Sequence, residues 1–259
     1  MSSVLHPAAQ QGFSLGAELY QQARPAYPED LIDWLTHQLH ISKKSKVIDL
    51  GAGTGKFLPY LKQVSDQVFA IEPIDELLAQ LKLAHPDVYT IQTDSKNLTL
   101  PSNSIDAICC AQSFHWFANA ESLYEIYHVL KPQAALGLIW NQRDTAVDWV
   151  QAIADLLTPL EQDTPRFHNG HWQKIFEQEK SLFQLKSLKK FHLEHQGSVE
   201  QVVVNRILST SFISAASDAE KLYIRQQLLE IIQKYCNKTA EDEITFPYVT
   251  YAYHYEKKC

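Results

Sequence analysis

The stretch Val47-Ile48-Asp49-Leu50-Gly51-Ala52-Gly53-Thr54-Gly55-Lys56 decides the fold of this chain. An apolar β-branched run followed by closely spaced glycines predicts a buried strand that turns sharply into a helix. The chain has 259 residues and only 8 glycines, and three of these lie within five residues of this turn. Glycine has no Cβ, so it accepts positive φ and lets a ligand approach the backbone closely. We therefore predict a strand over 46–50, a ligand-binding turn, and a helix from about Thr54 to Val64.

The spacing of these glycines separates two kinds of nucleotide-binding turn. A dinucleotide fingerprint reads G-x-G-x-x-G, whereas here the glycines alternate as G-x-G-x-G. Two hydrophobic residues, Asp, a hydrophobic residue and then this turn resemble motif I of the class I S-adenosylmethionine-dependent methyltransferases. The resemblance implies that the turn holds the amino-acid end of S-adenosylmethionine. The cofactor candidates that it implies in the motif are Asp49, Gly51, Ala52, Gly53 and Gly55.

Composition is that of an ordinary soluble globular protein. Hydrophobic residues make up 45% of the chain and charged residues 20%, with a formal net charge of −7. Because this balance offers no basic surface to a phosphate backbone, nucleic acid is not an expected partner. We find no signal-peptide pattern and no apolar run near the roughly 20 residues that span a bilayer. We therefore expect a cytoplasmic monomer or homodimer with a small-molecule substrate and no membrane partner.

Cysteines and histidines give no metal-binding pattern. The 4 cysteines lack CxxC spacing, and the 11 histidines include no HExxH motif. Cys109 and Cys110 lie within an apolar strand pattern, where free thiols pack as small hydrophobic groups. We expect reduced, structural cysteines and no metal site.

A proline-bracketed segment precedes the glycine turn, from Tyr20 to Pro28. Its two prolines impose an extended, rigid backbone. Many small-molecule methyltransferases carry a similar Y-x-x-x-R-P-x-Y-P stretch that closes over the cofactor. The resemblance implies that Tyr20 and Arg24 bind the cofactor, with Arg24 paired to its carboxylate. A simple entry into the helix predicted over 31–39 remains the alternative.

Polar residues follow the next strands, as expected of a nucleoside site. Glu72 and Pro73 end the strand predicted over 67–71, where a carboxylate can accept both ribose hydroxyls. Glu72 could instead cap the following helix. The resemblance implies an adenine contact for Asp94 and Ser95, although such residues are also common in turns. Gln112, directly after the fourth strand, completes the cofactor candidates.

Residues 113–117, Ser-Phe-His-Trp-Phe, follow the fourth strand, where the family places its reacting groups. They lack the N/D-P-P-Y/F sequence of base aminomethylases. They look like the small-molecule branch that includes ubiquinone-biosynthesis and trans-aconitate methyltransferases. His115 has a reference pKa near 6.5, which suits a general base. A purely packing role for His115 stays open, and Trp116 is expected to line the pocket.

Strands and helices alternate as in a doubly wound sheet. We predict an α/β, Rossmann-like, doubly wound sheet of seven strands. The family resemblance implies that the last strand (244–255) lies antiparallel between the fifth (134–140) and the sixth (183–193). The chain is predicted to be a single methyltransferase domain over 1–259, with a cofactor-binding core over 13–143 and helical lid insertions over 144–180 and 197–240.

The lid should select the acceptor. Substrate candidates near the strand ends and in the lid are Trp116, Trp140, Arg143, Arg206 and Phe212. Two guanidinium groups facing a pocket suit a carboxylate-bearing substrate, although surface salt bridges explain them equally well. The sequence thus predicts a methyltransferase for a small molecule, with a carboxylate oxygen favoured as acceptor. A catalytically silent cofactor-binding subunit and a nicotinamide-dependent oxidoreductase are the alternatives.

Overall fold

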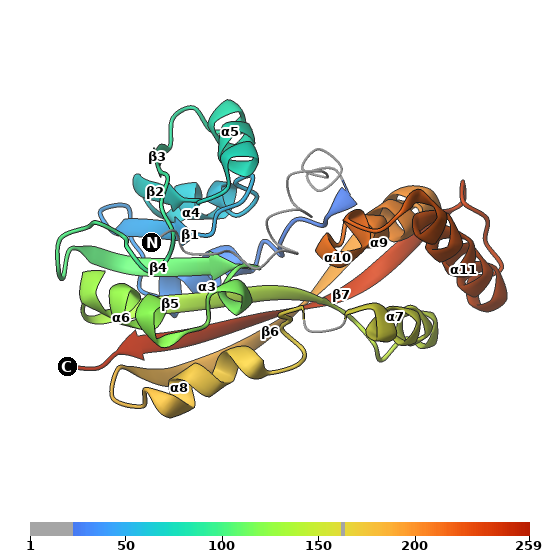
Figure 1. Ribbon diagram of the computed structural model, residues 1–259. Coiled ribbons are helices and arrows are strands. Elements are labelled where there is room, and N and C mark those ends of the chain that lie inside the picture. The colour runs from blue at the N-terminus through green and yellow to red at the C-terminus, as the bar shows by residue number, and fades with distance from the viewer. Residues whose placement is uncertain (1–22, 162–163) are drawn as a thin grey trace.

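The computed structural model describes residues 23–161 and 164–259, and within them the chain forms one sheet of seven strands (Figure 1). The strands are β1 (Lys46–Leu50), β2 (Gln67–Ile71), β3 (Tyr89–Ile91), β4 (Ile105–Ala111), β5 (Leu130–Arg143), β6 (Phe183–Ser198) and β7 (Glu243–Lys257). Their order is β3-β2-β1-β4-β5-β7-β6. The first five strands pair in parallel, and β7 runs antiparallel to both of its neighbours. The predicted Rossmann-like sheet and the position of its last strand are confirmed.

Helices cover both faces of this sheet. They are α3 (Leu31–His37), α4 (Leu58–Val64), α5 (Asp75–Ala84), η1 (Phe114–Trp116), α6 (Ala120–Val129), α7 (Asp148–Glu161), η2 (His171–Gln173), α8 (Lys174–Gln178), η3 (Glu200–Asn205), α9 (Arg206–Leu208), α10 (Ser211–Ser214) and α11 (Asp218–Cys236). α3 and α4 share one hydrophobic core with the sheet, and α6, η2 and α8 share another on the opposite face. The alternation of strand side chains explains this division, because Val47 belongs to the first core and Ile48 and Leu50 to the second.

The predicted start of the helix after the glycine turn is wrong. We expected the helix from about Thr54, but α4 begins at Leu58. Gly53 and Gly55 have φ values of 58° and 85°, which no right-handed helix allows. The turn therefore continues to Phe57, which leaves a longer loop above the end of β1.

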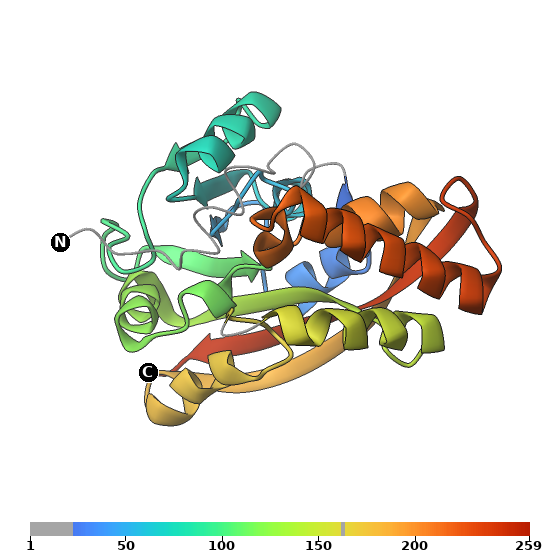
Figure 2. The same ribbon diagram turned by 45° about the vertical axis from the view of Figure 1, so that its right-hand side comes forward.

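A helical cap, made of α7 and of η3 through α11, gathers at one end of β6 and β7 (Figure 1). These two strands continue past the rest of the sheet, where Ser198 pairs with Glu243. The cap has its own hydrophobic core, which includes Trp149, Val203 and Phe246. Figure 2 shows α7 and α11 in this cap from a second direction.

The insertions differ in two ways from the predicted lid. Trp172 and Ile175, from the first insertion, pack in the core of the sheet rather than in the cap. Trp172 does so because its ring contacts Trp140 at 4.5 Å between centroids. In the second insertion, the chain first forms a π-helix, η3, that leads into the short α9.

No helix in residues 23–161 or 164–259 combines the length and apolar character that crossing a membrane requires. Cys109 and Cys110 are buried free thiols, as the strand pattern predicted.

Candidate functional site

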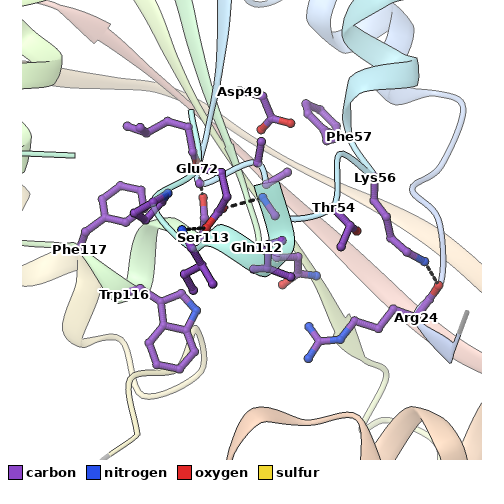
Figure 3. Close-up of a pocket in the computed structure, with 18 of the residues that line it drawn as sticks. Arg24, Asp49, Thr54, Lys56, Phe57, Glu72, Gln112, Ser113, Trp116 and Phe117 are labelled. Atoms are coloured by element: carbon purple, nitrogen blue, oxygen red, sulfur yellow. Dashed lines mark hydrogen bonds between the residues drawn. The ribbon is translucent and has the colours of Figure 1, made fainter. Parts of the chain in front are cut away.

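A cavity lies above the carboxyl ends of the parallel strands, beside the glycine turn (Figure 3). In a doubly wound sheet ligands bind at this edge, where the strand order reverses between β1 and β4. The predicted cofactor residues that line this cavity are Arg24, Asp49, Gly51, Ala52, Gly53, Glu72, Pro73, Asp94, Ser95 and Gln112. Tyr20 lies outside the described residues. We call this space the first cavity.

The glycine turn gives the first cavity its wall. A Cβ on Gly51, whose φ is +70°, would lie 2.6 Å from the Cβ of Ser113. A Cβ on Gly53 would meet no atom within 4 Å, so it would project into open space. Gly55 does not line the cavity, and a Cβ added to it would lie 2.6 Å from Cδ2 of His85. The first two glycines therefore bring bare backbone to the ligand space, whereas Gly55 shapes the turn behind it.

Glu72 is fixed at the end of β2. Its Oε2 accepts a hydrogen bond from the backbone N–H of Gly53 at 2.8 Å, and its Oε1 accepts one from Ile74 at 3.0 Å. The side chain is only 4% exposed. Burial raises the pKa of Glu72 to about 7, although both backbone hydrogen bonds oppose the shift. Each oxygen keeps a second lone pair that a ligand hydroxyl could use.

Asp49 is the second buried acid of the first cavity. Neither carboxylate oxygen has a hydrogen-bond partner among the described residues. Burial, assisted by the neighbouring Glu72, raises the pKa of Asp49 to about 8. Buried polar groups normally have partners, so an orphaned carboxyl at a cavity wall indicates that a ligand supplies one.

The segment around Arg24 is tied down beside the first cavity. Lys56 Nζ donates to the backbone carbonyl of Arg24 at 2.6 Å (Figure 3). The backbone N–H of Tyr27 donates to Tyr60 Oη at 3.0 Å, and that hydroxyl donates back to the Tyr27 carbonyl at 2.6 Å. Asn141 Nδ2 donates to the carbonyl of Ala26 at 2.9 Å. These bonds hold the Arg24 side chain at the cavity rather than in solvent.

A second cavity adjoins the first. Five residues line both cavities: Arg24, Gln112, Trp116, Asn141 and Arg206. The second cavity is also lined by His115, Trp140, Gln142, Arg143, Glu161, Arg166, Phe167, His168, Thr210 and Ser211. Four predicted substrate residues, Trp116, Trp140, Arg143 and Arg206, therefore face one space. Phe212 does not line it, but its ring centroid lies 4.6 Å from the guanidinium carbon of Arg166.

The second cavity is cationic. Its only acid in the described chain is Glu161, and Glu161 Oε2 lies 2.8 Å from His168 Nε2. Burial lowers the pKa of Arg166 to about 10. The nearby Glu161 carboxylate opposes this shift, and the positive charges of the other three arginines add to it: Arg24, Arg143 and Arg206. Nε and Nη2 of Arg166 are buried and have no partner in the part of the chain that is described.

His115 makes one decisive contact in the second cavity. Trp140 Nε1 donates a hydrogen bond to His115 Nδ1 at 3.0 Å. Burial, then the neighbouring Arg166 and Arg24, lower the pKa of His115 to about 3. The bond from Trp140 occupies the lone pair of Nδ1, which places the proton of the neutral imidazole on Nε2. The predicted role of His115 as a general base stays a prediction.

The sequence analysis missed Lys56, Glu161, Arg166 and His168 as site residues. The available signal was the cluster Arg166-Phe167-His168, a basic and aromatic run after Pro165. The sequence analysis assigned no role to this cluster. No group of three or more His, Cys, Asp or Glu side chains suited to a metal occurs in residues 23–161 and 164–259.

Comparison with known proteins agrees with this geometry. Residues 48–138 match the family model of a methyltransferase domain. An uncharacterized methyltransferase-like protein of Schizosaccharomyces pombe is 34% identical over 242 residues, which cover 92% of this chain and 93% of that protein. An uncharacterized methyltransferase of Mycobacterium tuberculosis is 37% identical over 146 residues, which cover 56% of this chain and 58% of that protein.

A structure from Anaeromyxobacter dehalogenans, described as a candidate type II methyltransferase, has the same fold. Its TM-score is 0.66 at 20% identity, and the match covers 91% of this chain and 97% of that one. The nicotinamide-dependent oxidoreductase is left without support, because the relatives, the glycine spacing and the strand order agree on another class. The chain belongs to the class I S-adenosylmethionine-dependent methyltransferases.

Proposed function

We propose that this methyltransferase acts on a small organic acid and methylates a carboxylate oxygen. The observation that supports the proposal most directly is the lining of the second cavity, where four arginines and, among the described residues, one acid (Glu161) lie together; the arginines are Arg24, Arg143, Arg166 and Arg206. Guanidinium groups bind carboxylates through paired, charge-assisted hydrogen bonds. An anionic acceptor is therefore the ligand that this wall suits best.

The residues of the first cavity fit S-adenosylmethionine. The open space at Gly53 leaves room for the amino-acid end of this molecule, and the orphaned oxygens of Asp49 suit its ammonium group. Glu72 is held where it can accept ribose hydroxyls, and Asp94 and Ser95 remain the candidates for adenine. When bound, S-adenosylmethionine supplies an electrophilic methyl group on a sulfonium.

The residues that line both cavities mark the place where the methyl group can pass from cofactor to acceptor. Because Trp116, Gln112 and Arg206 line both spaces, an acceptor in the second cavity faces the cofactor in the first. The protein then contributes mainly alignment and exclusion of water. An ionised carboxylate is already a nucleophile, so the reaction needs no general base. This agrees with a site in which the Nδ1 lone pair of His115 already accepts a hydrogen bond from Trp140.

We also infer that the cap selects the acceptor, as the predicted lid would. It contributes Glu161 from the end of α7 and Arg206 from α9 to the second cavity. Thr210 and Ser211, at the start of α10, line the same space. Ser211 Oγ is buried without a partner in the described residues, which makes it a further candidate to contact the acceptor.

The test combines binding with product chemistry. Calorimetry with S-adenosylhomocysteine establishes that the first cavity binds the cofactor product. Methyl-labelled S-adenosylmethionine is then offered with carboxylic acids, phenols and amines of similar size. We expect label only in the acids, in a form that mild base releases as methanol, because methyl esters hydrolyse and methyl ethers or methylamines do not.

Two results would contradict the proposal. Base-stable label in a phenol or an amine would refute a carboxylate acceptor. Binding of S-adenosylhomocysteine without transfer to any acceptor would favour the catalytically silent subunit instead.

A further inference from the structure

His115 occupies the place where an acceptor must be held. It lies in η1, the turn directly after β4, between Gln112 and Trp116 in the sequence, and both of these residues line the two cavities. Its own side chain lines only the second cavity, the proposed acceptor space. A polar group of His115 can therefore contact an acceptor without lining the cofactor cavity.

The bond from Trp140 fixes which nitrogen of His115 carries the proton. An indole N–H can only donate, so His115 Nδ1, 3.0 Å away, must present its lone pair. In a neutral imidazole the proton then resides on Nε2. Nε2 accepts and donates no hydrogen bond within the described chain, and it is the remaining polar atom of a side chain on the cavity wall.

The indole that makes this bond is itself immobilised. Trp140 lies in β5, in the middle of the sheet, and is 0% exposed. Its ring packs against Trp172 at 4.5 Å, Phe167 at 5.0 Å and Tyr253 at 6.0 Å between centroids. Because these rings hold the indole, the direction of its N–H is fixed by the core and not by the ligand.

The surroundings of His115 oppose any second proton. The titratable groups that face it are Arg24 from the N-terminal segment, and Arg166 and His168 from the loop after α7, all of which are basic. Glu161, the acid of this cavity, is engaged by His168. A proton on Nδ1 would also oppose the N–H of Trp140 directly. Both effects keep His115 neutral when an acceptor arrives.

We propose that His115 is a fixed, neutral hydrogen-bond donor, whose Nε2–H holds an acceptor oxygen, and that Trp140 is the positioning residue that sets this tautomer. The proposal rests on the proposed function in one respect, namely that the contacted atom is an acceptor oxygen. It adds a selection rule. An ammonium group has no lone pair to accept from Nε2–H, so this contact favours carboxylates over protonated amines.

Nitrogen NMR of the full-length protein tests the tautomer without any substrate. In ¹⁵N-labelled protein we expect His115 to show the Nε2–H tautomer and no titration between about pH 5 and pH 8, with the resonance assigned by its loss in His115→Gln. An Nδ1–H tautomer, or titration near the reference pKa of about 6.5, would overturn the proposal.

The Trp140→Phe variant tests the positioning role. It keeps an aromatic ring but removes the N–H, so we expect mixed tautomers, a new pH dependence of kcat/KM between about pH 5 and pH 8, and a KM for the acid acceptor raised about tenfold. Trp34→Phe is the matched control, because its buried indole N–H has no partner in the described residues. A Trp140→Phe enzyme that behaves like Trp34→Phe would refute the role.

The NMR arm also separates this proposal from the proposed function. If no acid is methylated while His115 shows the Nε2–H tautomer, the proposed acceptor is wrong, but the proposal that Trp140 sets the tautomer of His115 stands. If acids are methylated and His115 titrates between about pH 5 and pH 8, the role of Trp140 is refuted and the proposed function stands. Should Trp140→Phe not fold, the NMR result on the wild-type protein still decides the tautomer.

Discussion

Asp49 is a buried acid without a hydrogen-bond partner among the described residues, in the cavity proposed to bind the cofactor. Its burial lowers the stability of the folded protein at a pH where the carboxyl is ionised in the unfolded chain. In the unfolded chain Asp49 loses its proton near the ordinary pKa of 3.8, whereas in the folded protein it keeps the proton to about pH 8. Between these values the folded state binds more protons, so stability falls as pH rises. The loss for this one group is at most about 6 kcal/mol across that range.

We predict that Asp49→Asn flattens this pH dependence. Relative to the wild type, the variant should lose less of its free energy of unfolding between pH 5 and pH 8, as urea denaturation at the two pH values would measure. It should also bind S-adenosylhomocysteine more weakly, because an amide does not balance the ligand ammonium. Equal slopes for the two proteins would show that Asp49 ionises in the folded state as it does in the unfolded chain.

Arg206 offers a second test at the scale of single residues, because it lies at the junction of the two cavities and its Nε is buried without a partner in the described chain. Arg206→Gln should raise KM for an acid acceptor about tenfold or more, since a charge-assisted hydrogen bond contributes roughly 1.5–3 kcal/mol. Arg225→Gln is the control, because Arg225 is paired with Glu200 at 2.9 Å and lines neither cavity. Equal KM values for the two variants would remove Arg206 from the acceptor site.

Some site residues can be predicted from local sequence pattern, and others depend on contacts that only the folded chain makes. Asp49 and Glu72 could be predicted, because their positions at strand ends are set by local pattern. Arg166 could not, because it reaches the cavity from a loop with no periodic pattern. The sequence also gives the reference pKa of His115 but not its neighbour Trp140, which is 25 residues away along the chain.

In the glycine turn between β1 and α4, Gly51 and Gly53 have different surroundings: one position faces a packed side chain and the other faces the open cavity. Gly51 and Gly53 both have positive φ, so an alanine at either position carries a strain of roughly 1–2 kcal/mol. Only at Gly51 would the new Cβ also clash, 2.6 Å from Ser113. At Gly53 it would enter the open space of the first cavity.

We therefore predict opposite profiles for the two variants. Gly51→Ala should lose more stability, by thermal denaturation, than Gly53→Ala. Gly53→Ala should lose more affinity for S-adenosylhomocysteine, by calorimetry, than its modest loss of stability explains. If Gly53→Ala bound the ligand as tightly as the wild type, the turn would not contact the cofactor.

β1, β2 and β4 were predictable as elements because each is a short, largely apolar run, whereas the ends of the longer strands were not predictable. β5 extends over Leu130–Arg143, beyond the predicted 134–140, because it pairs along its length with β7 from the far end of the chain. The start of α4 was missed for a local reason, since the backbone angles of Gly53 and Gly55 exclude a helix. Pattern gave the type of each element, and long-range pairing set its length.

At the scale of the whole molecule, the cap and the sheet are joined by continuous strands. β6 and β7 pair in the sheet, where Phe183 opposes Lys257, and also in the cap, where Ser198 opposes Glu243. The sequence predicted the lid as two insertions but gave no sign that one end of the β6–β7 pair would serve as its base. That arrangement depends on contacts between segments far apart in the chain.

This continuity predicts one cooperative unfolding transition for cap and sheet. Phe246 is fully buried in the core of the cap, with its ring 4.9 Å from those of Trp149 and Tyr248. Phe246→Ala should lower the free energy of unfolding by about 3–5 kcal/mol and shift the whole calorimetric transition, because loss of the cap core also loosens strands that the sheet needs. Leu222→Ala, at a side chain 66% exposed on α11, should leave the transition almost unchanged. A separate low-temperature transition in Phe246→Ala, with the sheet melting as in the wild type, would show instead that the cap unfolds on its own and that the acceptor wall can open without disturbing the cofactor cavity.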